Sequence, residues 1–164
     1  MKNLELIAAI GKNNELGYNN ELIWHIKEDL KSFKAITMNK NMIMGMNTYN
    51  SIPQNLEGRK YIILTRKHII IPNTNIYNSK EELYDNIEEN EKYIVIGGGQ
   101  IYKLFINDVD VMYLTHINDS YIKADTFFPT FNEDDFTKEL LSEGKDEIPY
   151  KQYKYIRRNI WQID

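Results

Sequence analysis

Five short runs of apolar residues limit what this chain can fold into more than any other feature of its sequence. The runs are rich in Ile, Val, Leu and Tyr, and they span Leu4–Ile10, Asn41–Met44, Tyr61–Thr65, Tyr93–Ile96 and Val109–Ile117. Near-continuous apolar runs of this length are typical of strands that are buried on both faces of a parallel sheet. Polar segments with helical patterns separate the runs, so the sequence predicts an α/β protein.

Three of the intervening segments are expected to be helices. Residues 28–38 place apolar side chains on one helical face and lysines on the other. Ser79, followed three residues later by Glu82, is a capping-box signature for a second helix through about residue 87. Residues 100–106 form the third helix, directly after a run of glycines.

The C-terminal third of the chain has a different pattern. Residues 136–143 and 150–161 alternate in polarity and carry many aromatic side chains, which predicts an antiparallel β-hairpin. The length of 164 residues suits one domain with one substantial core. We therefore expect a single domain over residues 1–164, with a mainly parallel sheet, flanking helices and an added C-terminal hairpin.

The composition argues against several classes of function. A net charge of −4 with scattered lysines and arginines argues against a general nucleic-acid-binding protein. The absence of cysteine excludes disulfides and thiolate metal sites, and the three histidines lack metal-ligand spacing, so no metal site is expected. No apolar run approaches the ~18–20 residues of a membrane helix, and the first run is too short for a signal peptide. These features predict a soluble, cytoplasmic protein.

A run of three glycines, Gly97, Gly98 and Gly99, lies between a predicted buried strand and a predicted helix. Consecutive glycines let a backbone approach a ligand closely, and the N-terminus of the following helix offers free N–H groups to a phosphate. The pattern is not the GxGxxG fingerprint of dinucleotide-binding proteins. A plain tight turn is an equally good interpretation of an isolated glycine triplet.

Two other strand ends carry residues that suit phosphates. Gly45 follows a buried strand, and the next polar residues, Asn47 and Thr48, could cap a helix or bind an anion. Arg66 and its neighbour Lys67 end another strand, where they could hold a phosphate or simply be solvated. Ligands of open α/β sheets bind beyond the carboxyl ends of the strands, so together these ends suggest a dinucleotide along one edge of the sheet.

Asp29 lies beside the apolar face of the first predicted helix. Burying a carboxylate there is costly unless it is paired, and Trp24, Leu30 and Phe33 would surround it with apolar groups that suit a flat aromatic ligand. The alternative is an ordinary acid near a helix N-terminus, favoured by the helix dipole. These residues alone do not decide between the two.

Taken together, the motifs resemble the dihydrofolate reductase family almost from end to end. Any one motif is weak, but their order and spacing are specific. The resemblance is carried by Ile7-Ala8-Ala9, Leu16-Gly17, Trp24 with Asp29-Leu30 and Phe33-Lys34, Ile43-Met44-Gly45, Thr48-Tyr49 with Ser51-Ile52-Pro53, Gly58-Arg59, Ile96-Gly97-Gly98-Gly99 with Ile101-Tyr102, Tyr113-Leu114-Thr115, and Asp125-Thr126 followed by Phe128-Pro129.

The resemblance implies an eight-stranded mixed sheet, a cis Gly97–Gly98 peptide and a monomer that reduces 7,8-dihydrofolate with NADPH. It implies that Asp29 holds the pterin ring, that Thr115 orients this carboxylate and that Trp24 fixes a water beside it. The segment Gly11–Trp24 corresponds to the family's mobile loop, which closes over the nicotinamide.

The resemblance also implies two sets of binding residues. The expected substrate-binding residues are Ile7, Ala8, Leu22, Leu30, Phe33, Ser51, Ile52, Leu56, Arg59, Ile96 and Tyr102. Among them, Arg59 matches the arginine that binds the glutamate α-carboxylate of the substrate. The expected cofactor-binding residues are Ala9, Leu16, Gly17, Asn20, Gly45, Met46, Asn47, Thr48, Leu64, Thr65, Arg66, Ser79, Gly97, Gly98, Gly99, Gln100, Ile101 and Thr126.

The sequence departs from the family pattern near the cofactor's 2′-phosphate. Met46 stands where many relatives have arginine, and Asn47 where some have histidine. We still expect NADPH rather than NADH, because Arg66 remains. Two other hypotheses are a reductase of riboflavin synthesis, which lacks the joint placement of Trp24, Asp29, Phe33 and Arg59, and a catalytically silent dinucleotide sensor, which the presence of Asp29 disfavours.

Overall fold

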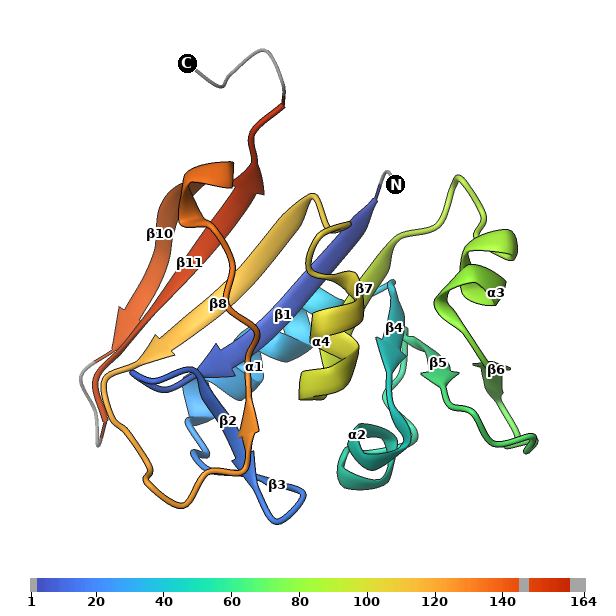
Figure 1. Cartoon of the computed structure of the whole chain (residues 1–164), viewed down its shortest axis with the longest axis horizontal. Helices are drawn as coiled ribbons and strands as arrows, with labels where there is room; N and C mark the ends of the chain where they lie inside the picture. Colours follow the sequence, from blue (N-terminus) through green and yellow to red (C-terminus); the bar gives the residue numbers. More distant parts are fainter. Residues whose placement is uncertain (1–2, 145–147, 160–164) are drawn as a thin grey trace.

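The computed structural model describes residues 3–144 and 148–159, and its main feature is an eight-stranded sheet. The strands of this sheet are β1 (Leu4–Ile10), β4 (Asn41–Met44), β5 (Lys60–Leu64), β6 (Thr74–Tyr77), β7 (Tyr93–Gly97), β8 (Val111–Ile117), β10 (Phe136–Gly144) and β11 (Tyr150–Arg157). Their order across the sheet is β10-β11-β8-β1-β7-β4-β5-β6 (Figure 1). The six strands from β8 to β6 pair in parallel, whereas β11 pairs antiparallel with both β8 and β10. The predicted mixed, mostly parallel sheet with a C-terminal hairpin is confirmed.

The strand bounds follow the apolar runs closely. β1 and β4 have the predicted bounds, and β5 lies one residue earlier than predicted. β8 begins at Val111 rather than Val109, because the Val109 N–H still donates to the carbonyl of Phe105 at the end of a helix. The second strand of the hairpin ends at Arg157, and the remainder of the predicted segment up to residue 161 lies partly outside the described residues.

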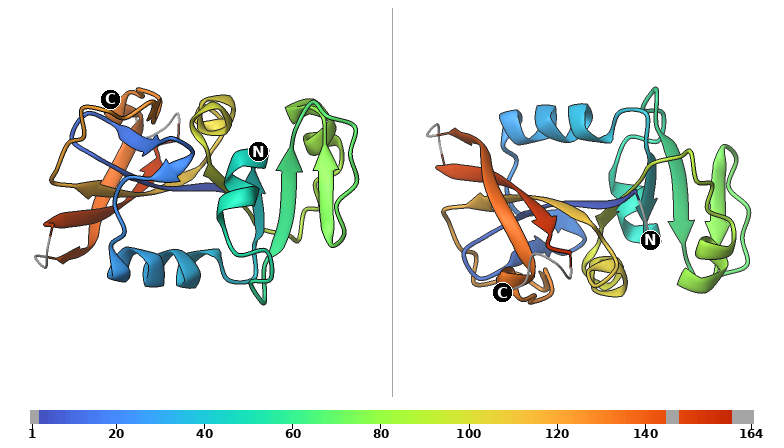
Figure 2. Two further views of the ribbon diagram at one scale, coloured as in Figure 1. Left: turned by 90° about the horizontal axis from the view of Figure 1, so that it is seen from below. Right: turned by 90° about the horizontal axis from the view of Figure 1, so that it is seen from above.

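Helices cover both faces of the sheet and make the three layers (Figure 2). On one face, Phe33 and Ile36 of α1 (Lys27–Thr37) pack against strand residues such as Ile94, and α2 (Met46–Ser51) packs on the same cluster. On the other face lie α3 (Lys80–Asp85) and α4 (Gly99–Phe105), whose Leu83 and Phe105 are buried. A short 3-10 helix, η1, spans Glu133–Asp135. No helix in the described part of the chain is long and apolar enough to cross a membrane.

The central strands form the core because they are apolar on both faces. Leu4, Leu6, Met42, Ile43 and Ile94 are fully buried. Burying a side chain of this size contributes roughly 1.5–3 kcal/mol. This burial fixes β1, β4 and β7 at the middle of the sheet, where their carboxyl ends lie next to one another.

The predicted N-terminal cap of α3 is confirmed, whereas the predicted side-chain cap of α2 is wrong. The Ser79 hydroxyl accepts a hydrogen bond from the Glu82 N–H at 3.0 Å, although α3 ends at Asp85, two residues before the predicted end. α2 begins after Gly45, which has no side chain to cap it. Asn47 and Thr48 therefore lie inside the first turn of α2 and do not cap it.

The segment 11–24 is folded into a small sheet rather than an irregular loop. β2 (Glu15–Tyr18) pairs with β3 (Glu21–Leu22) and with β9 (Thr126–Phe127). The turn residues Asn19 and Asn20 have φ values of 52° and 63°. Positive φ at both central residues is the requirement of a type I′ hairpin turn, which asparagine tolerates well. This small sheet and α2 lie at the lower end of the central sheet in Figure 1.

Candidate active site

The candidate site begins where the central strands end. The N–H of Gly45, after β4, donates to the carbonyl of Gly97 at the end of β7 at 3.0 Å. On the other side of β7, the hydroxyl of Tyr102 from α4 bonds to the carbonyls of Ile7 in β1 and Ile96 in β7, at 2.7 and 2.8 Å. Burial raises the pKa of this tyrosine, so it remains a neutral donor. These contacts hold the ends of three strands in register.

Asp29 of α1 meets Thr115 of β8 at this edge. The Thr115 hydroxyl donates to Oδ1 of Asp29 at 2.5 Å, and Thr115 itself is only 1% exposed. Burial raises the pKa of the Asp29 carboxyl, and the hydrogen bond from Thr115 opposes that rise. The sequence left open whether Asp29 was a simple helix-terminal acid. Its burial and its bond to a strand 86 residues away favour a site residue.

The apolar side chains predicted to contact the substrate fall into three groups. Ile7, Ile96, Phe33, Ile52 and Leu56 belong to one cluster on the α1 face of the sheet. Leu22 and Leu30 are 56% and 44% exposed, so their apolar surface is left uncovered by the protein. Ala8 and Tyr102 belong to the cluster on the opposite face. Ala8 can therefore offer only its backbone to a ligand on the α1 side, because successive side chains of a strand point to opposite faces.

The glycine run after β7 is shaped by its surroundings. The Gly97–Gly98 peptide is cis, as the resemblance implied. Gly97 has a φ of +122°, and a Cβ there would lie 3.1 Å from the Tyr102 hydroxyl oxygen. A Cβ at Gly99 would lie 3.0 Å from both the Phe127 carbonyl oxygen and a Thr126 methyl carbon. A side chain at either position would crowd these neighbours, which is more than a plain tight turn requires.

Gly98 differs from its two neighbours because the space beside it is open. Among the described residues, only the Thr48 hydroxyl comes within 4 Å of a Cβ built at Gly98, at 3.7 Å. Thr48 lies in the first turn of α2, and Gly45 precedes that helix. The backbones of Gly45 and Gly98 and the Thr48 side chain therefore lie close together at the ends of β4 and β7, with room beside Gly98 for a methyl group.

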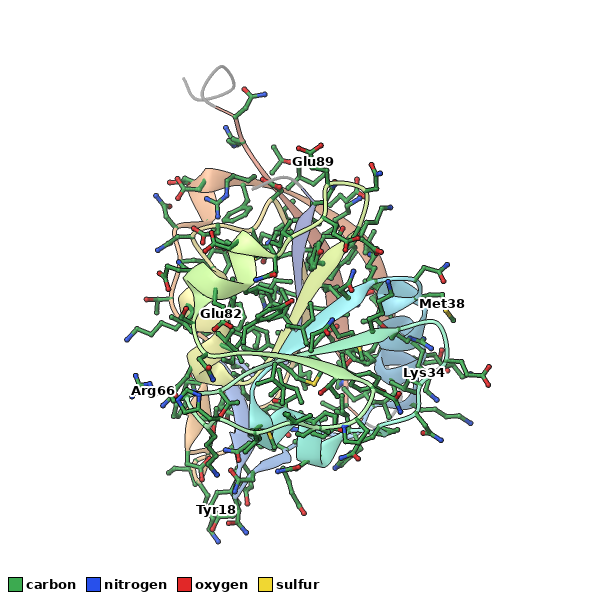
Figure 3. The ribbon with its side chains drawn as sticks, turned by 90° about the vertical axis from the view of Figure 1, so that its right-hand side faces the viewer. Tyr18, Lys34, Met38, Arg66, Glu82 and Glu89 are labelled. Carbon is green, nitrogen blue, oxygen red and sulfur yellow. The ribbon has the colours of Figure 1, made fainter. Side chains whose placement is uncertain are left out.

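The remaining residues predicted to bind the cofactor differ in how deeply they are buried. Leu16 and Leu64 are buried, and Gly97 is also buried. The residues that are partly buried are Ala9, Gly17, Gly45, Met46, Thr48, Thr65, Ser79, Gly98, Gly99, Ile101 and Thr126. Asn20, Asn47, Arg66 and Gln100 are exposed, and Arg66 lies at the edge of the molecule in Figure 3. The Ser79 hydroxyl already caps α3, and the Thr65 hydroxyl accepts from the Lys67 N–H at 3.3 Å.

Three further predicted side chains are already bonded to protein groups. The Trp24 indole N–H donates to Oδ2 of Asp119 at 3.0 Å, which lowers the pKa of that carboxyl. A water held by Trp24 beside Asp29 therefore requires this bond to be given up. The Arg59 guanidinium donates to the Thr37 hydroxyl and to the carbonyls of Glu57 and Lys34. Ser51, also predicted, is exposed and donates to the Thr48 carbonyl.

Several residues at the site were not predicted. Asp125 accepts from the Asn19 N–H at 3.0 Å, and buried Glu15 accepts from the N–H groups of Asn13 and Tyr121 at 2.7 and 2.6 Å. Burial would raise the pKa of Glu15, but these backbone N–H groups lower it overall. Both carboxylates tie the small sheet to the segment after β8. The dipeptide Asn19-Asn20 is the one local signal that could have indicated this hairpin.

The fold is that of an α/β protein with a mostly parallel sheet, a class in which ligands generally bind beyond the carboxyl ends of the strands. A family model described as "Dihydrofolate reductase" matches residues 3–159. The chain is 36% identical over 154 residues to the dihydrofolate reductase of Buchnera aphidicola subsp. Acyrthosiphon pisum (strain APS), covering 93% of this chain and 95% of that relative. It is 35% identical over 160 residues to the dihydrofolate reductase of Staphylococcus haemolyticus, covering 96% of each. The chain therefore belongs to the dihydrofolate reductase family.

A third relative agrees with this assignment over a shorter region. The dihydrofolate reductase type 3 of Salmonella typhimurium is 34% identical over 129 residues, or 78% of this chain and 79% of that protein.

Among residues 3–144 and 148–159, no group of three His, Asp or Glu side chains is arranged to hold a metal ion.

Proposed function

We propose that this protein is an NADPH-dependent dihydrofolate reductase that converts 7,8-dihydrofolate to 5,6,7,8-tetrahydrofolate. The observation that carries the proposal is the Asp29 carboxylate, which is largely buried, bonded through one oxygen to Thr115 and bordered by uncovered apolar side chains. In the family, the carboxylate at this position is the group that selects the pterin.

Asp29 would bind the pterin through a pair of parallel hydrogen bonds. The pterin edge presents N3–H and a 2-amino group side by side, and a carboxylate matches two such donors as it matches the fork of an arginine. Thr115 holds the plane of the carboxylate from the strand side. The exposed face of Leu30 and the half-buried ring of Phe33 provide apolar contacts for the flat ring.

The same carboxylate would also prepare the ring for reduction. A negative charge in a largely buried site stabilises a positive charge on a bound ring more strongly than it would in water. Asp29 would therefore favour the pterin protonated at N5, and water would deliver that proton. Ile7 and Ile96, both buried, keep other solvent from the ring.

The room beside Gly98 would admit a nicotinamide nucleotide, because a Cβ there would meet only the Thr48 hydroxyl, at 3.7 Å, whereas a Cβ at Gly97 or Gly99 would crowd its neighbours. Gly45, Gly98 and Thr48 would hold the pyrophosphate region, and Arg66 with Thr65 would hold the 2′-phosphate. Bound NADPH would supply the hydride that reduces C6 of the pterin. The Arg59 guanidinium, fixed by three protein acceptors, would use its other N–H groups for the substrate's α-carboxylate.

The direct test is to mix the protein with dihydrofolate and NADPH and to follow the near-ultraviolet absorbance of the reduced nicotinamide. We expect a steady loss of absorbance that depends on both compounds. Folded protein that produces no loss would overturn the proposal. The same assay with the pyrimidine substrate of riboflavin synthesis in place of dihydrofolate tests the alternative reductase, which would oxidise NADPH only with that pyrimidine.

Asp29→Asn tests the role of the carboxylate. An amide keeps the shape but loses the charge, so hydride transfer should fall severely at neutral pH and less at acid pH, where the substrate is already protonated. The measurement is the pre-steady-state rate of NADPH oxidation across pH. A variant with the wild-type profile would show that Asp29 does not polarise the pterin.

We further propose that the protein acts as a monomer in the cytoplasm and supplies tetrahydrofolate for one-carbon metabolism. Light scattering coupled to size-exclusion chromatography would measure the oligomeric state, with a dimer as the contradicting result. Expression in a bacterial strain that lacks its own reductase should restore growth without thymidine, and the Asp29→Asn variant should fail to do so.

A further inference from the structure

Behind Asp29 lies a buried amide that the proposed mechanism does not use. Gln152 of β11 is only 4% exposed and pairs directly with Thr115 in the register of β8 and β11. Its Nε2 donates to the Thr115 hydroxyl at 3.4 Å, and its Oε1 accepts from the Ser32 hydroxyl at 3.0 Å. Ser32 lies one helical turn after Asp29 on α1, so the four side chains form a chain of three hydrogen bonds that begins and ends on α1.

The hydrogen bonds among these four groups run in one direction. Gln152 presents its amide oxygen to Ser32 and its amide nitrogen to Thr115, and an amide nitrogen can only donate whereas an amide oxygen can only accept. Thr115 must then accept from Gln152 through a lone pair of its oxygen. The single hydroxyl proton of Thr115 is thereby left for Asp29.

We propose that Gln152, held by Ser32, is a positioning residue that makes the Thr115 hydroxyl a fixed hydrogen-bond donor to Asp29. Without Gln152, the hydroxyl could rotate and accept a hydrogen bond from the protonated, neutral carboxyl instead. This chain of hydrogen bonds therefore favours the ionised carboxylate, against the burial that raises the pKa of Asp29. The consequence for catalysis rests on the proposed reductase function, whereas the effect on Asp29 itself does not.

A purely structural role would not require these residue types. Buried polar groups are costly unless every donor and acceptor is satisfied, and an apolar pair at positions 32 and 152 could bridge α1 and β11 without that requirement. Here the 3.4 Å contact from Gln152 is long, so its contribution to stability is small. Its effect is to orient the neighbouring hydroxyl.

The other ionisable groups around Asp29 do not set its pKa. They are exposed, are bonded to other groups or lie on the opposite face of a strand: Glu28, Lys27, Lys31 and Lys34 of α1, Tyr102 of α4, Tyr113 and His116 of β8, Lys151, Tyr153 and Lys154 of β11, and Asp119. Burial and the Thr115 bond are the influences that set the pKa of Asp29.

The test is to follow the titration of the Asp29 carboxyl carbon by NMR in protein labelled at aspartate, with the Asp29→Asn variant used to assign the signal. The key variants are Gln152→Leu, which keeps the side-chain size, and Ser32→Ala, which frees the Gln152 amide. We expect both to move the midpoint of Asp29 upward, by about half a pH unit for Gln152→Leu, the scale of one modest hydrogen-bond effect. The acid limb of kcat/KM should move by the same amount.

Two controls separate positioning from a general change of the core. Asn41→Leu removes another buried amide, which bonds to Glu91 and to the Lys92 carbonyl at the far end of β4, and it should leave the Asp29 midpoint unchanged. In a Thr115→Val background, Gln152→Leu should cause no further shift, because the hydroxyl through which it acts is gone.

An unchanged midpoint in both Gln152→Leu and Ser32→Ala would overturn the proposal. An equal shift with and without the Thr115 hydroxyl would also overturn it, because the effect would then be desolvation by the leucine. The NMR titration needs no turnover, so a protein without reductase activity would refute the proposed function and still test this inference.

Discussion

The bond between Thr115 and Asp29 gives the sharpest stability prediction. Thr115→Val removes the hydroxyl that donates to the carboxylate at 2.5 Å and leaves the Gln152 amide without its acceptor. Because Thr115 is 1% exposed, bulk water cannot replace the lost donor without entering the core. The exchange keeps the branched shape of the side chain, so cavity formation is a minor effect.

The expected loss depends on the charge of Asp29. A hydrogen bond to an ionised group contributes roughly 1.5–3 kcal/mol, whereas one to a neutral group contributes about 0.5–1.5 kcal/mol. A change of 1 kcal/mol shifts the Tm of a protein of this size by roughly 2–4 °C. Thr115→Val should therefore lower the Tm by roughly 3–12 °C where Asp29 is ionised, and by less where it is protonated.

The direction of the pH dependence follows from the pKa of Asp29. Burial raises that pKa, so this group's contribution to stability is complete below the unfolded pKa and is lost as pH rises through the folded pKa. The Thr115 donor opposes the rise. Thr115→Val removes this donor, so the pKa of Asp29 rises further and the loss of stability with rising pH becomes steeper. The variant should therefore be most destabilised at neutral pH.

Thermal unfolding followed by circular dichroism, from below the unfolded aspartate pKa of about 3.9 up to roughly pH 8, would measure the effect. The matched control is Thr74→Val, because the Thr74 hydroxyl donates at 2.8 Å to the neutral carbonyl of Ile71. The Thr74→Val variant should be destabilised by the same amount at every pH. If Thr115→Val behaves in the same pH-independent way, the charge-assisted bond to Asp29 contributes nothing to stability.

Two further variants test the cofactor side of the site. Gly97→Ala should lower the free energy of unfolding by roughly 1–3 kcal/mol in urea titrations, because the new Cβ would meet the Tyr102 hydroxyl at a φ of +122°. Gly98→Ala, in open space, should keep its stability and weaken NADPH binding, and equal stability losses in the two variants would contradict the assignment. Arg66→Gln should raise the KM for NADPH roughly tenfold, the effect of one lost charge-assisted hydrogen bond, and leave the KM for NADH unchanged. An equal rise for both cofactors would show that Arg66 does not contact the 2′-phosphate.

Local pattern was enough to predict most helix positions and seven of the eight strands of the large sheet, but not β6 or the three strands of the small sheet. β1 and β4 have the predicted bounds because an apolar run that is buried on both faces ends where polar residues begin. The cap of α3 was predictable because Ser79 and Glu82 bond within one helical turn. The cap of α2 was mispredicted, because Gly45 takes that position without any side chain to signal it.

The segment 11–24 shows where local pattern was insufficient. Asn19 and Asn20 form a hairpin turn that the sequence signals only weakly, and Asp125 secures it from more than 100 residues away. Trp24 illustrates the same limit, because its indole N–H bonds to Asp119 on a distant segment. Such partners depend on how the small sheet packs against the segment after β8.

The sequence by itself determined the α/β class, the burial of the central strands, and Asp29 as a carboxylate beside an apolar helical face. Only the tertiary structure decided what that carboxylate meets. Thr115 faces Asp29 because β8 lies beside β1, and Gln152 faces Thr115 because β11 pairs antiparallel with β8 in one register. A shift of one residue would turn Gln152 to the other face of the sheet, since side chains alternate along a strand. Strand order and register are set by packing of the whole core, which local sequence pattern does not specify.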